Sequence, residues 1–457
     1  MYGSGLFHLV RMILIRLLVA SSLVVLVVGP VLPSVAREET PLALTRENES
    51  TLSALEDTGS DVGGLGMVPS GPEEQHLVRM PGGLASVAEL PSSVDLAPSS
   101  LLLEAQPSYE GIPPVGNQGD TETCTAWATS YYYKTYQEWF ERGWNLRNPG
   151  PDYDHIFSPG FVYNQITGGS DAECDDGAQI DAALNLIVNQ GDLPWSGFPW
   201  NPLAPSCSSL PTPAQESAAL PYRGLDYGAF FTTPGGGPPD GPVQNHNLTP
   251  LRQWVASGDP FVLGFPVCSE FDDYACFEAV PPPADPGTCR GLHAVAVVGY
   301  DDNWAGVGAF KIVNSYGSQW GCYGYAWLSY EFVRKYAWEA WWMWDNWAPS
   351  IDPHVPDLVS PTLGSTLVVD LTPYENDRED SGTALKWYVE GADHCTVYGE
   401  GSSNDVLQFA PNLSGFSGYD EITLILRDSR ELEDRQQMTL GWFDLDPVSY
   451  LPLAVKN

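Results

Sequence analysis

The sequence has few basic residues. It contains 20 Lys and Arg residues against 58 Asp and Glu residues, which gives a net charge of −38 at pH 7. Because nucleic acids and anionic membranes attract cationic surfaces, this charge argues against both as partners. The sequence also lacks internal repeats, a glycine-rich phosphate loop and a cysteine or histidine spacing that fits zinc. We therefore expect no metal and no other cofactor in the main globular region.

A strongly apolar run, "LLVASSLVVLVVGPVLPSVA", lies at the N-terminus after Arg11 and Arg16. No acidic residue precedes it, and the small residues Ser34 and Ala36 suit signal cleavage. We predict a signal peptide over residues 1–36, and hence a secreted or cell-surface protein without stable membrane insertion after cleavage. An uncleaved membrane anchor is the alternative, because the run is close to spanning length.

The chain of 457 residues is too long for a single hydrophobic core. Residues 37–89 are rich in Glu, Ser, Gly and Pro and are predicted to form a pro-region or a disordered linker. A globular domain is expected over residues 90–347, and the Pro-rich stretch "APSIDPHVPDLVSP" marks its end. Residues 348–447 show only strand patterns and predict a β-sandwich. The apolar tail 448–457 is too short to cross a bilayer; it is either a sorting signal for cell-surface attachment or a last strand.

Within residues 90–347 the pattern mixes helices and strands. A helix is predicted from Cys124 to about Arg142, with Thr123 as a candidate N-cap, and a second helix ends at Gly191. The Pro- and Gly-dense residues 196–245 are expected to form long surface loops. Four short strands are predicted at "PFVLGFPV", "HAVAVVGYDD", "GAFKIVNSYG" and "YGYAWLSY", and "DDNWAGVG" can join the second and third as a hairpin. The fold class is therefore α+β.

Cys124 stands in the stretch "PPVGNQGDTETCTAWATSYYY". A single cysteine in an exported chain is more often half of a disulfide than a nucleophile. A thiol attacks a carbonyl as thiolate, and it needs a base, a group that orients the base, and donors for the oxyanion. Gln118, six residues before Cys124, can donate to an oxyanion beside the Cys124 N–H. His293 and Asn314 lie on the two predicted hairpin strands, where Asn314 can fix the imidazole tautomer. The predicted helix start at Cys124 is expected to lower the thiol pKa.

These residues belong to segments that resemble the papain-like cysteine peptidases. "PVGNQGDTETCTAWA" is similar to the family's active-site segment, "GLHAVAVVGYD" to its histidine segment, and "IVNSYGSQWGCYGYAWLS" to its asparagine segment. "LPSSVDLA" resembles the start of the mature enzyme. The four segments occur in the family's order, and the resemblance spans roughly residues 90 to 335.

The resemblance implies a papain-like two-lobed fold, with one helical and one β-barrel-like lobe, that hydrolyses peptide bonds through a thioester. It gives Cys124 the nucleophile's role, His293 the acid/base role, Asn314 the orienting role and Gln118 the oxyanion role. Trp320 matches an aromatic residue that shields the Asn–His hydrogen bond.

The sequence departs from the plant-type family pattern at several positions. Thr121 replaces the usual second cysteine, so the disulfide at the active-site loop is expected to be absent. Thr125 follows the nucleophile in place of an aromatic residue, Tyr316 replaces a tryptophan, and Leu292 precedes His293 where plant-type members have an aspartate. These departures look like the bacterial-type branch of the family. Residues 37–89 do not resemble its helical inhibitory propeptide.

The resemblance also suggests substrate contacts. Gly291 and Ala294, on either side of His293, match positions near the main specificity pocket. Asp176 and Gly177 lie where the family has a glycine-rich edge that pairs with extended substrate backbone.

The other cysteines and the acidic loops leave alternatives open. We expect Cys174 and Cys207 to form a disulfide; Cys268, Cys276, Cys289 and Cys322 can pair in three ways. With Cys124 free, seven cysteines remain, so at least one more stays unpaired within the chain. In the C-terminal domain, "YENDREDSG" and Asp428 suggest either a calcium site or a solvated acidic loop.

The sequence therefore predicts an exported papain-like cysteine endopeptidase, a hydrolase acting on protein or peptide substrates, with a C-terminal Ig-like or cadherin-like β domain. Acyl transfer through the same thioester is a second enzymatic hypothesis. The alternative from another class is a cell-surface adhesin or binding module with a vestigial papain-like cleft. The intact set of four catalytic residue types argues against that alternative.

Overall fold

The structure is a computed structural model, and it describes residues 64–82, 84, 90–97, 111–147, 151–201, 206–234, 236–239, 241–377 and 380–444. The predicted signal peptide over residues 1–36 and the tail over residues 448–457 lie outside these described residues. Of the predicted pro-region or linker, residues 64–82 and 84 are described. No helix within the described ranges combines the length and the apolar character needed to cross a membrane.

A seven-stranded sheet organises the first part of the described chain. Its strand order is β4-β9-β5-β6-β7-β8, and β2 pairs with β6 beside this path. Every pairing in this sheet is antiparallel. The strands are β2 (Ser93–Asp95), β4 (Gly224–Phe231), β5 (Phe261–Val267), β6 (Gly291–Asp301), β7 (Ala309–Val313), β8 (Tyr325–Ser329) and β9 (Glu339–Asp345). All four strands predicted from the pattern are confirmed.

The hairpin between β6 and β7 is confirmed as well. Asp301 pairs with Ala309, and the connecting residues include the short 3₁₀ helix η7 (Trp304–Gly306). Gly306 and Gly308 have φ of 75° and 71°, a backbone conformation that glycine adopts without strain. The local sequence therefore encodes the turn, and the turn places β6 and β7 side by side as an antiparallel pair.

The helix that begins at the candidate nucleophile has the predicted extent but not regular α geometry. It consists of α3 (Cys124–Ala126), a π-helical segment η4 (Trp127–Lys134) and α4 (Thr135–Arg142). The Thr135 N–H donates to the carbonyl of Ser130, five residues earlier, as a π-helix requires. Thr123 occupies the N-cap position, but its side chain makes no capping hydrogen bond; its hydroxyl instead lies 2.7 Å from that of Thr121.

The second predicted helix is α6 (Ile180–Gln190), and Gly191 ends it with φ of 87°. The expectation of long loops over residues 196–245 was wrong. This stretch contains α7 (Pro213–Ala219), a 3₁₀ helix η5 (Leu220–Tyr222) and the edge strand β4. A capping box between Thr212 and Gln215 starts α7, and pairing with β9 stabilises β4 despite the local Pro and Gly content.

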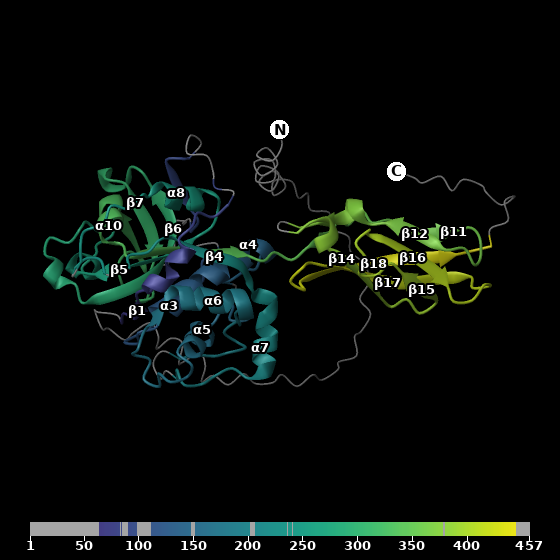
Figure 1. The fold of residues 1–457 in the computed structure, drawn as a ribbon, viewed down its shortest axis with the longest axis horizontal. Helices are drawn as coiled ribbons and strands as arrows, with labels where there is room; N and C mark the ends of the chain where they lie inside the picture. Colours follow the sequence, from purple (N-terminus) through teal and green to yellow (C-terminus); the bar gives the residue numbers. More distant parts are fainter. Residues whose placement is uncertain are drawn as a thin grey trace, which may run out of the picture. The chain divides into compact units, whose positions relative to one another are not determined.

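Further helices and short strands complete this part. They are β1 (Met67–Val68), η2 (Pro72–Leu77), α5 (Pro159–Ile166), β3 (Ala178–Gln179), α8 (Thr249–Ala256), α9 (Ser269–Asp272), η6 (Pro286–Thr288) and α10 (Tyr330–Tyr336). Figure 1 draws α3, α5 and α6 grouped together, and strands β5, β6 and β7 beside α8 and α10.

Two hydrophobic cores lie on the two faces of the sheet. Along β6, Ala294, Ala296 and Val298 join the core that contains the helical residues, whereas Val295 and Val297 join the other. This alternation follows from the two-residue period of a strand. Helices thus pack against a sheet that is covered on both faces, and the predicted α+β class is confirmed.

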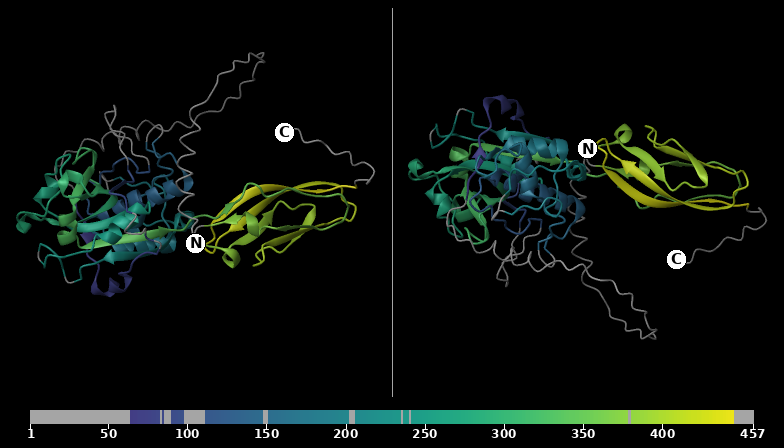
Figure 2. Two further views of the ribbon diagram at one scale, coloured as in Figure 1. Left: turned by 90° about the horizontal axis from the view of Figure 1, so that it is seen from above. Right: turned by 90° about the horizontal axis from the view of Figure 1, so that it is seen from below.

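Residues 350–442 form a region rich in β-sheet, as expected. One sheet has the order β11-β18-β17-β14 and a second has the order β12-β16-β15, and their side chains share one core. In Figure 2 these yellow-green to yellow strands run along one common direction. The elements are β10 (Ser350–Ile351), β11 (Leu358–Ser360), β12 (Leu367–Asp370), η8 (Thr372–Tyr374), β13 (Glu375–Asn376), η9 (Gly382–Ala384), β14 (Lys386–Glu390), β15 (Cys395–Tyr398), β16 (Val406–Pro411), β17 (Gly418–Arg427) and β18 (Glu433–Trp442).

All eight cysteines lie in described residues. The expected disulfide between Cys174 and Cys207 is confirmed. Of the three open pairings, the structure contains Cys268 with Cys289 and Cys276 with Cys322. Cys124 and Cys395 are free and buried, so Cys395 is the further unpaired cysteine that the odd count required.

Candidate active site

Cys124 lies at the contact between the first helix and the sheet. It is the first residue of α3, and its Sγ accepts a hydrogen bond of 3.3 Å from the Ala294 N–H on β6. Ala294 directly follows His293. The candidate nucleophile and the candidate base, 169 residues apart in sequence, therefore come from two elements that touch.

His293 and Asn314 form a hydrogen-bonded pair across the hairpin. His293 Nε2 lies 2.7 Å from Asn314 Oδ1. The Ser315 N–H also donates to Asn314 Oδ1, at 2.8 Å, which identifies this atom as the amide oxygen. Since an oxygen accepts, Nε2 carries the proton and Nδ1 is unprotonated, so that it can accept one. This is the tautomer that a general base needs.

Gln118 is joined to the same loop as Asn314. Its Oε1 accepts a 2.5 Å hydrogen bond from the Ser315 hydroxyl, and its backbone N–H donates to the Ser315 carbonyl at 2.8 Å. Its Nε2 donates to the carbonyls of Thr121, at 2.6 Å, and Leu65, at 3.1 Å. Ser315, which was not predicted from the sequence, thus links Gln118, the candidate oxyanion donor, to the loop that contains Asn314.

Burial controls the charge states of Cys124 and His293. Burial raises the pKa of the Cys124 thiol to about 12, although hydrogen bonds from Ala294 and Thr125 oppose the shift. Burial lowers the pKa of His293 to about 3; the nearby Arg290 charge acts in the same direction, while the bond to Asn314 opposes it. Both groups are therefore neutral at pH 7 in this structure. In this state the shift of the thiol pKa is opposite to the one expected from the helix start, because burial disfavours the charged thiolate.

Aromatic rings enclose the imidazole. Tyr316 is the ring nearest to His293, with centroids 4.7 Å apart, and its hydroxyl lies 3.4 Å from Nδ1. Trp320 lies one ring further out, 5.8 Å from Tyr316 and 4.8 Å from Phe271. Phe271, which the sequence analysis did not single out, is itself 6.1 Å from His293.

The candidate substrate-binding residues lie on two edges of the site. Gly177 directly precedes β3, and its N–H donates a hydrogen bond to the Tyr163 hydroxyl oxygen at 3.0 Å. Asp176 is exposed, and its N–H donates to Asp171. Gly291 and Ala294 belong to β6. A side chain at Gly177 or Gly291 would collide with residues 65 and 66 of this same chain.

Acidic side chains that the sequence analysis did not use lie near this edge. Asp181 on α6 and Glu339 on β9 are both buried, and both contact Ser70. Glu339 interrupts the aromatic run "YAWEAWWMW". An acidic residue inside such a run was the sequence signal that could have identified this buried carboxyl group. Burial raises the pKa of Glu339 to about 7 and also raises that of Asp181.

Two groups of three carboxylates lie close enough to share a cation among the described residues. They are Glu138, Glu141 and Asp345, and Asp171, Asp175 and Asp176. The first is already bound by the buried ammonium of Lys134, which contacts Glu138 at 2.7 Å and also Asp345. Neither group includes Asp428, so calcium in the C-terminal region stays a prediction.

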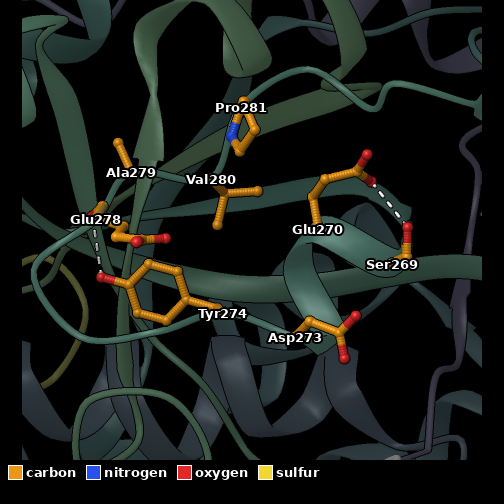
Figure 3. A pocket seen from close by; sticks show the side chains of 8 residues that line it. All are labelled: Ser269, Glu270, Asp273, Tyr274, Glu278, Ala279, Val280 and Pro281. Atoms are coloured by element: carbon orange, nitrogen blue, oxygen red, sulfur yellow. Dashed lines mark hydrogen bonds between the residues drawn. The ribbon is translucent and has the colours of Figure 1, made fainter.

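A pocket is lined by other residues than the four candidates (Figure 3). In it, the Ser269 hydroxyl donates to Glu270 and the Tyr274 hydroxyl donates to the Glu278 carbonyl, both at 3.1 Å. Its lining residues are Ser269, Glu270, Asp273, Tyr274, Glu278, Ala279, Val280 and Pro281.

Comparison with known proteins gives consistent similarities. Residues 240–339, which include His293 and Asn314, match the family model described as papain family cysteine protease. An uncharacterized peptidase C1-like protein of Acanthamoeba polyphaga mimivirus is 26% identical over 253 residues, covering 54% of this chain and 74% of that protein.

Two solved structures illustrate the structural similarity. Xylellain, a cysteine protease from Xylella fastidiosa, aligns with a TM-score of 0.45 and 23% identity, covering 62% of this chain and 96% of its own. Digestive procathepsin L 3 of Tenebrio molitor aligns with a TM-score of 0.41 and 19% identity, covering 65% of this chain and 79% of its own.

Proposed function

We propose that the chain is a papain-family cysteine peptidase that hydrolyses peptide bonds in protein or peptide substrates. The observation that carries this proposal is the contact of Cys124 with the strand of His293, together with the 2.7 Å bond that joins His293 Nε2 to Asn314. This bond leaves Nδ1 as a proton acceptor, and the catalytic cysteine of such a mechanism requires one.

The proposed reaction starts with acylation. The Cys124 thiol gives its proton to His293 Nδ1, and the sulfur forms a bond to the substrate carbonyl carbon. Gln118 Nε2 and the Cys124 N–H donate to the resulting oxyanion. The imidazolium then protonates the leaving amine as the C–N bond breaks, and a thioester remains.

Deacylation uses the same residues. His293 takes a proton from water, the hydroxide adds to the thioester carbonyl, and the C–S bond breaks to release the acid and restore the thiol. An added amine in place of water would give acyl transfer, so analysis of the products in the presence of a primary amine separates the two reactions.

The proposal extends to the whole chain. We propose a secreted or cell-surface protein of the bacterial-type branch, with an Ig-like or cadherin-like domain in residues 348–447 that positions the enzyme. Three disulfides support an oxidising compartment. Calcium binding in the C-terminal region is part of this proposal, and calcium titration of the protein followed by its melting temperature tests it.

The test of the activity is casein cleavage by the full chain and by its Cys124→Ala variant. We expect cleavage by the full chain and a loss of at least about 1,000-fold in the variant, because the nucleophile is removed. Cys395→Ala is the matched control, since Cys395 is the other free, buried cysteine. Equal cleavage by all three proteins would assign the activity to a contaminant. Absence of cleavage by the full chain would refute the peptidase proposal.

A further inference from the structure

The pocket drawn in Figure 3 is built from α9, the two residues that follow it and residues 278–281. Its volume is about 280 Å³. Ligand pockets measure roughly 300–1,000 Å³, so this one has the size for a single side chain and not for a long ligand. We call it the acidic pocket, because Glu270, Asp273 and Glu278 are among its eight lining residues.

The acidic pocket has no positive charge of its own. Among the described residues its lining offers three carboxylates and no Lys, Arg or His. The side chains of Asp273 and Glu278 are exposed, and within the described ranges neither forms an ion pair or a hydrogen bond. The net charge of −38 on the whole chain adds to this local field. A cationic group is therefore favoured in the pocket and an anionic one is repelled.

Hydrogen bonds fix one wall of the pocket. Glu270 Oε1 accepts from the Ala284 N–H at 2.7 Å, and Glu270 Oε2 accepts from the Ser269 hydroxyl at 3.1 Å. The Tyr274 hydroxyl donates to the Glu278 carbonyl at 3.1 Å and so joins the two walls (Figure 3). A ligand that enters a pre-formed pocket of this kind loses little free energy to ordering of the protein.

The second wall is attached to the edge strand β8 of the sheet. The Val280 N–H donates to the Trp327 carbonyl at 2.7 Å, and the Ser329 N–H donates to the Val280 carbonyl at 3.0 Å. The Glu278 carbonyl also accepts from Trp304 Nε1 at 2.8 Å. The free carboxylate of Glu278 thus stands on backbone that is held from two sides.

The lining matches the side chain of a lysine or an arginine. Such a side chain has an aliphatic stem and a charged head. Val280 and Pro281 offer apolar surface to the stem, and the Tyr274 ring is a surface on which a cation is stabilised. The carboxylates of Asp273 and Glu278 are free to accept charge-assisted hydrogen bonds from the head.

Two exposed aromatic rings stand next to the pocket. Phe277, directly before Glu278, is 71% exposed and has φ of 71°, and Tyr323 is 47% exposed and has φ of 56°. Each follows a cysteine of the disulfide between Cys276 and Cys322, so the two residues belong to one neighbourhood. Bulky residues rarely adopt a positive φ, and conformations of this kind cluster at functional sites. Exposed rings held in this way are typical anchors for a partner.

The acidic pocket and the candidate active site share α9. Phe271 of this helix is buried, 6.1 Å from the ring of His293 and 4.8 Å from that of Trp320. Cys322, which precedes Tyr323, lies two residues after Trp320. A partner bound at the pocket would therefore lie beside the catalytic groups without occupying them.

We propose that the acidic pocket, together with Phe277 and Tyr323, is an exosite, a docking surface outside the catalytic groups. It binds protein substrates that present a lysine or arginine beside an apolar residue in an unfolded region. The inference rests on the proposed peptidase function and names a substrate class for it. Docking at the exosite raises the effective concentration of the substrate chain at Cys124.

The first experiment measures the Kd of fluorescein-labelled, reduced and carboxamidomethylated lysozyme, an unfolded basic protein, for the full chain. Fluorescence anisotropy in about 0.15 M NaCl screens the general attraction between the two proteins. Cys124→Ala in every variant prevents cleavage during the titration. We expect Asp273→Asn combined with Glu278→Gln to raise the Kd by about ten-fold or more, because the bound cation loses both free carboxylates.

The aromatic part of the exosite has its own variant. Phe277→Gly removes the ring, and glycine adopts the φ of 71° without strain, so the fold is kept. We expect the Kd to rise by about five-fold or more. Unchanged near-ultraviolet circular dichroism identifies variants that keep the fold.

Glu216→Gln combined with Asp393→Asn is the matched control. It changes the net charge by the same amount at two exposed positions, and the Kd should stay within about two-fold of the Cys124→Ala chain. An equal rise in both double variants would show that lysozyme responds to net charge alone, and it would overturn the exosite. An unchanged Kd in the Asp273, Glu278 and Phe277 variants would overturn it as well.

Kinetics separate the exosite from the peptidase proposal. In the chain with Cys124 intact, the ratio of kcat/KM for carboxamidomethylated lysozyme to that for a short peptide amide should fall by about ten-fold in the Asp273→Asn, Glu278→Gln variant, since only the protein reaches the pocket. A constant ratio would overturn the assignment to substrates. The expected changes in Kd without cleavage of either substrate would support the docking surface and refute the peptidase function.

Discussion

Gln118 donates its side-chain amide to the backbone carbonyl of Leu65 at 3.1 Å. The residue proposed to stabilise the oxyanion therefore binds a carbonyl of its own chain. That carbonyl comes from a segment 53 residues earlier. The candidate catalytic groups are assembled, and the same structure shows them covered.

The role of Gln118 can be tested by removing its donor while keeping its shape. Gln118→Glu is expected to lower kcat/KM for a peptide amide by about 100-fold or more, because a carboxylate cannot donate to the oxyanion. Steady-state kinetics measures the effect. Gln165→Glu, on helix α5, is the control. A loss confined to KM would assign Gln118 to substrate binding and not to the oxyanion.

Asn314 is expected to act as a positioning residue for His293. Asn314→Ala should reduce kcat by roughly 10- to 100-fold, since the imidazole loses its fixed tautomer and orientation. The pH profile of kcat/KM should also shift, because the bond to Asn314 raises the pKa of the ring. An unchanged profile with reduced protein stability would indicate a structural role alone.

His293 is expected not to titrate near neutrality in this chain. Burial lowers its pKa to about 3, so the ring stays neutral from pH 5 to pH 9. Nuclear magnetic resonance of the imidazole protons, assigned with His293→Gln, measures this directly. A neutral-range titration in the wild-type chain would contradict this burial of the imidazole.

Much of the fold follows from local sequence patterns. The strands, the hairpin between β6 and β7, and the helix that begins at Cys124 were all predicted at nearly their observed positions. Each depends on periodicity, turn residues or helix ends, which are encoded within about ten to twenty residues. The loops expected over residues 196–245 were the exception, since pairing with β9 overrides local Pro and Gly content there.

The sequence by itself determined the order of Gln118, Cys124, His293 and Asn314 and the elements that hold them. Only the tertiary structure decided that Ser315 joins two of these residues, how Cys268, Cys276, Cys289 and Cys322 pair, and that residues 64–70 lie against the site. Ser70 and Glu339 are 269 residues apart, and β1 and β3 pair over two residues each. Such contacts have no period and no local signature. They arise when the folded chain brings buried polar groups together, because each needs a hydrogen-bond partner away from water.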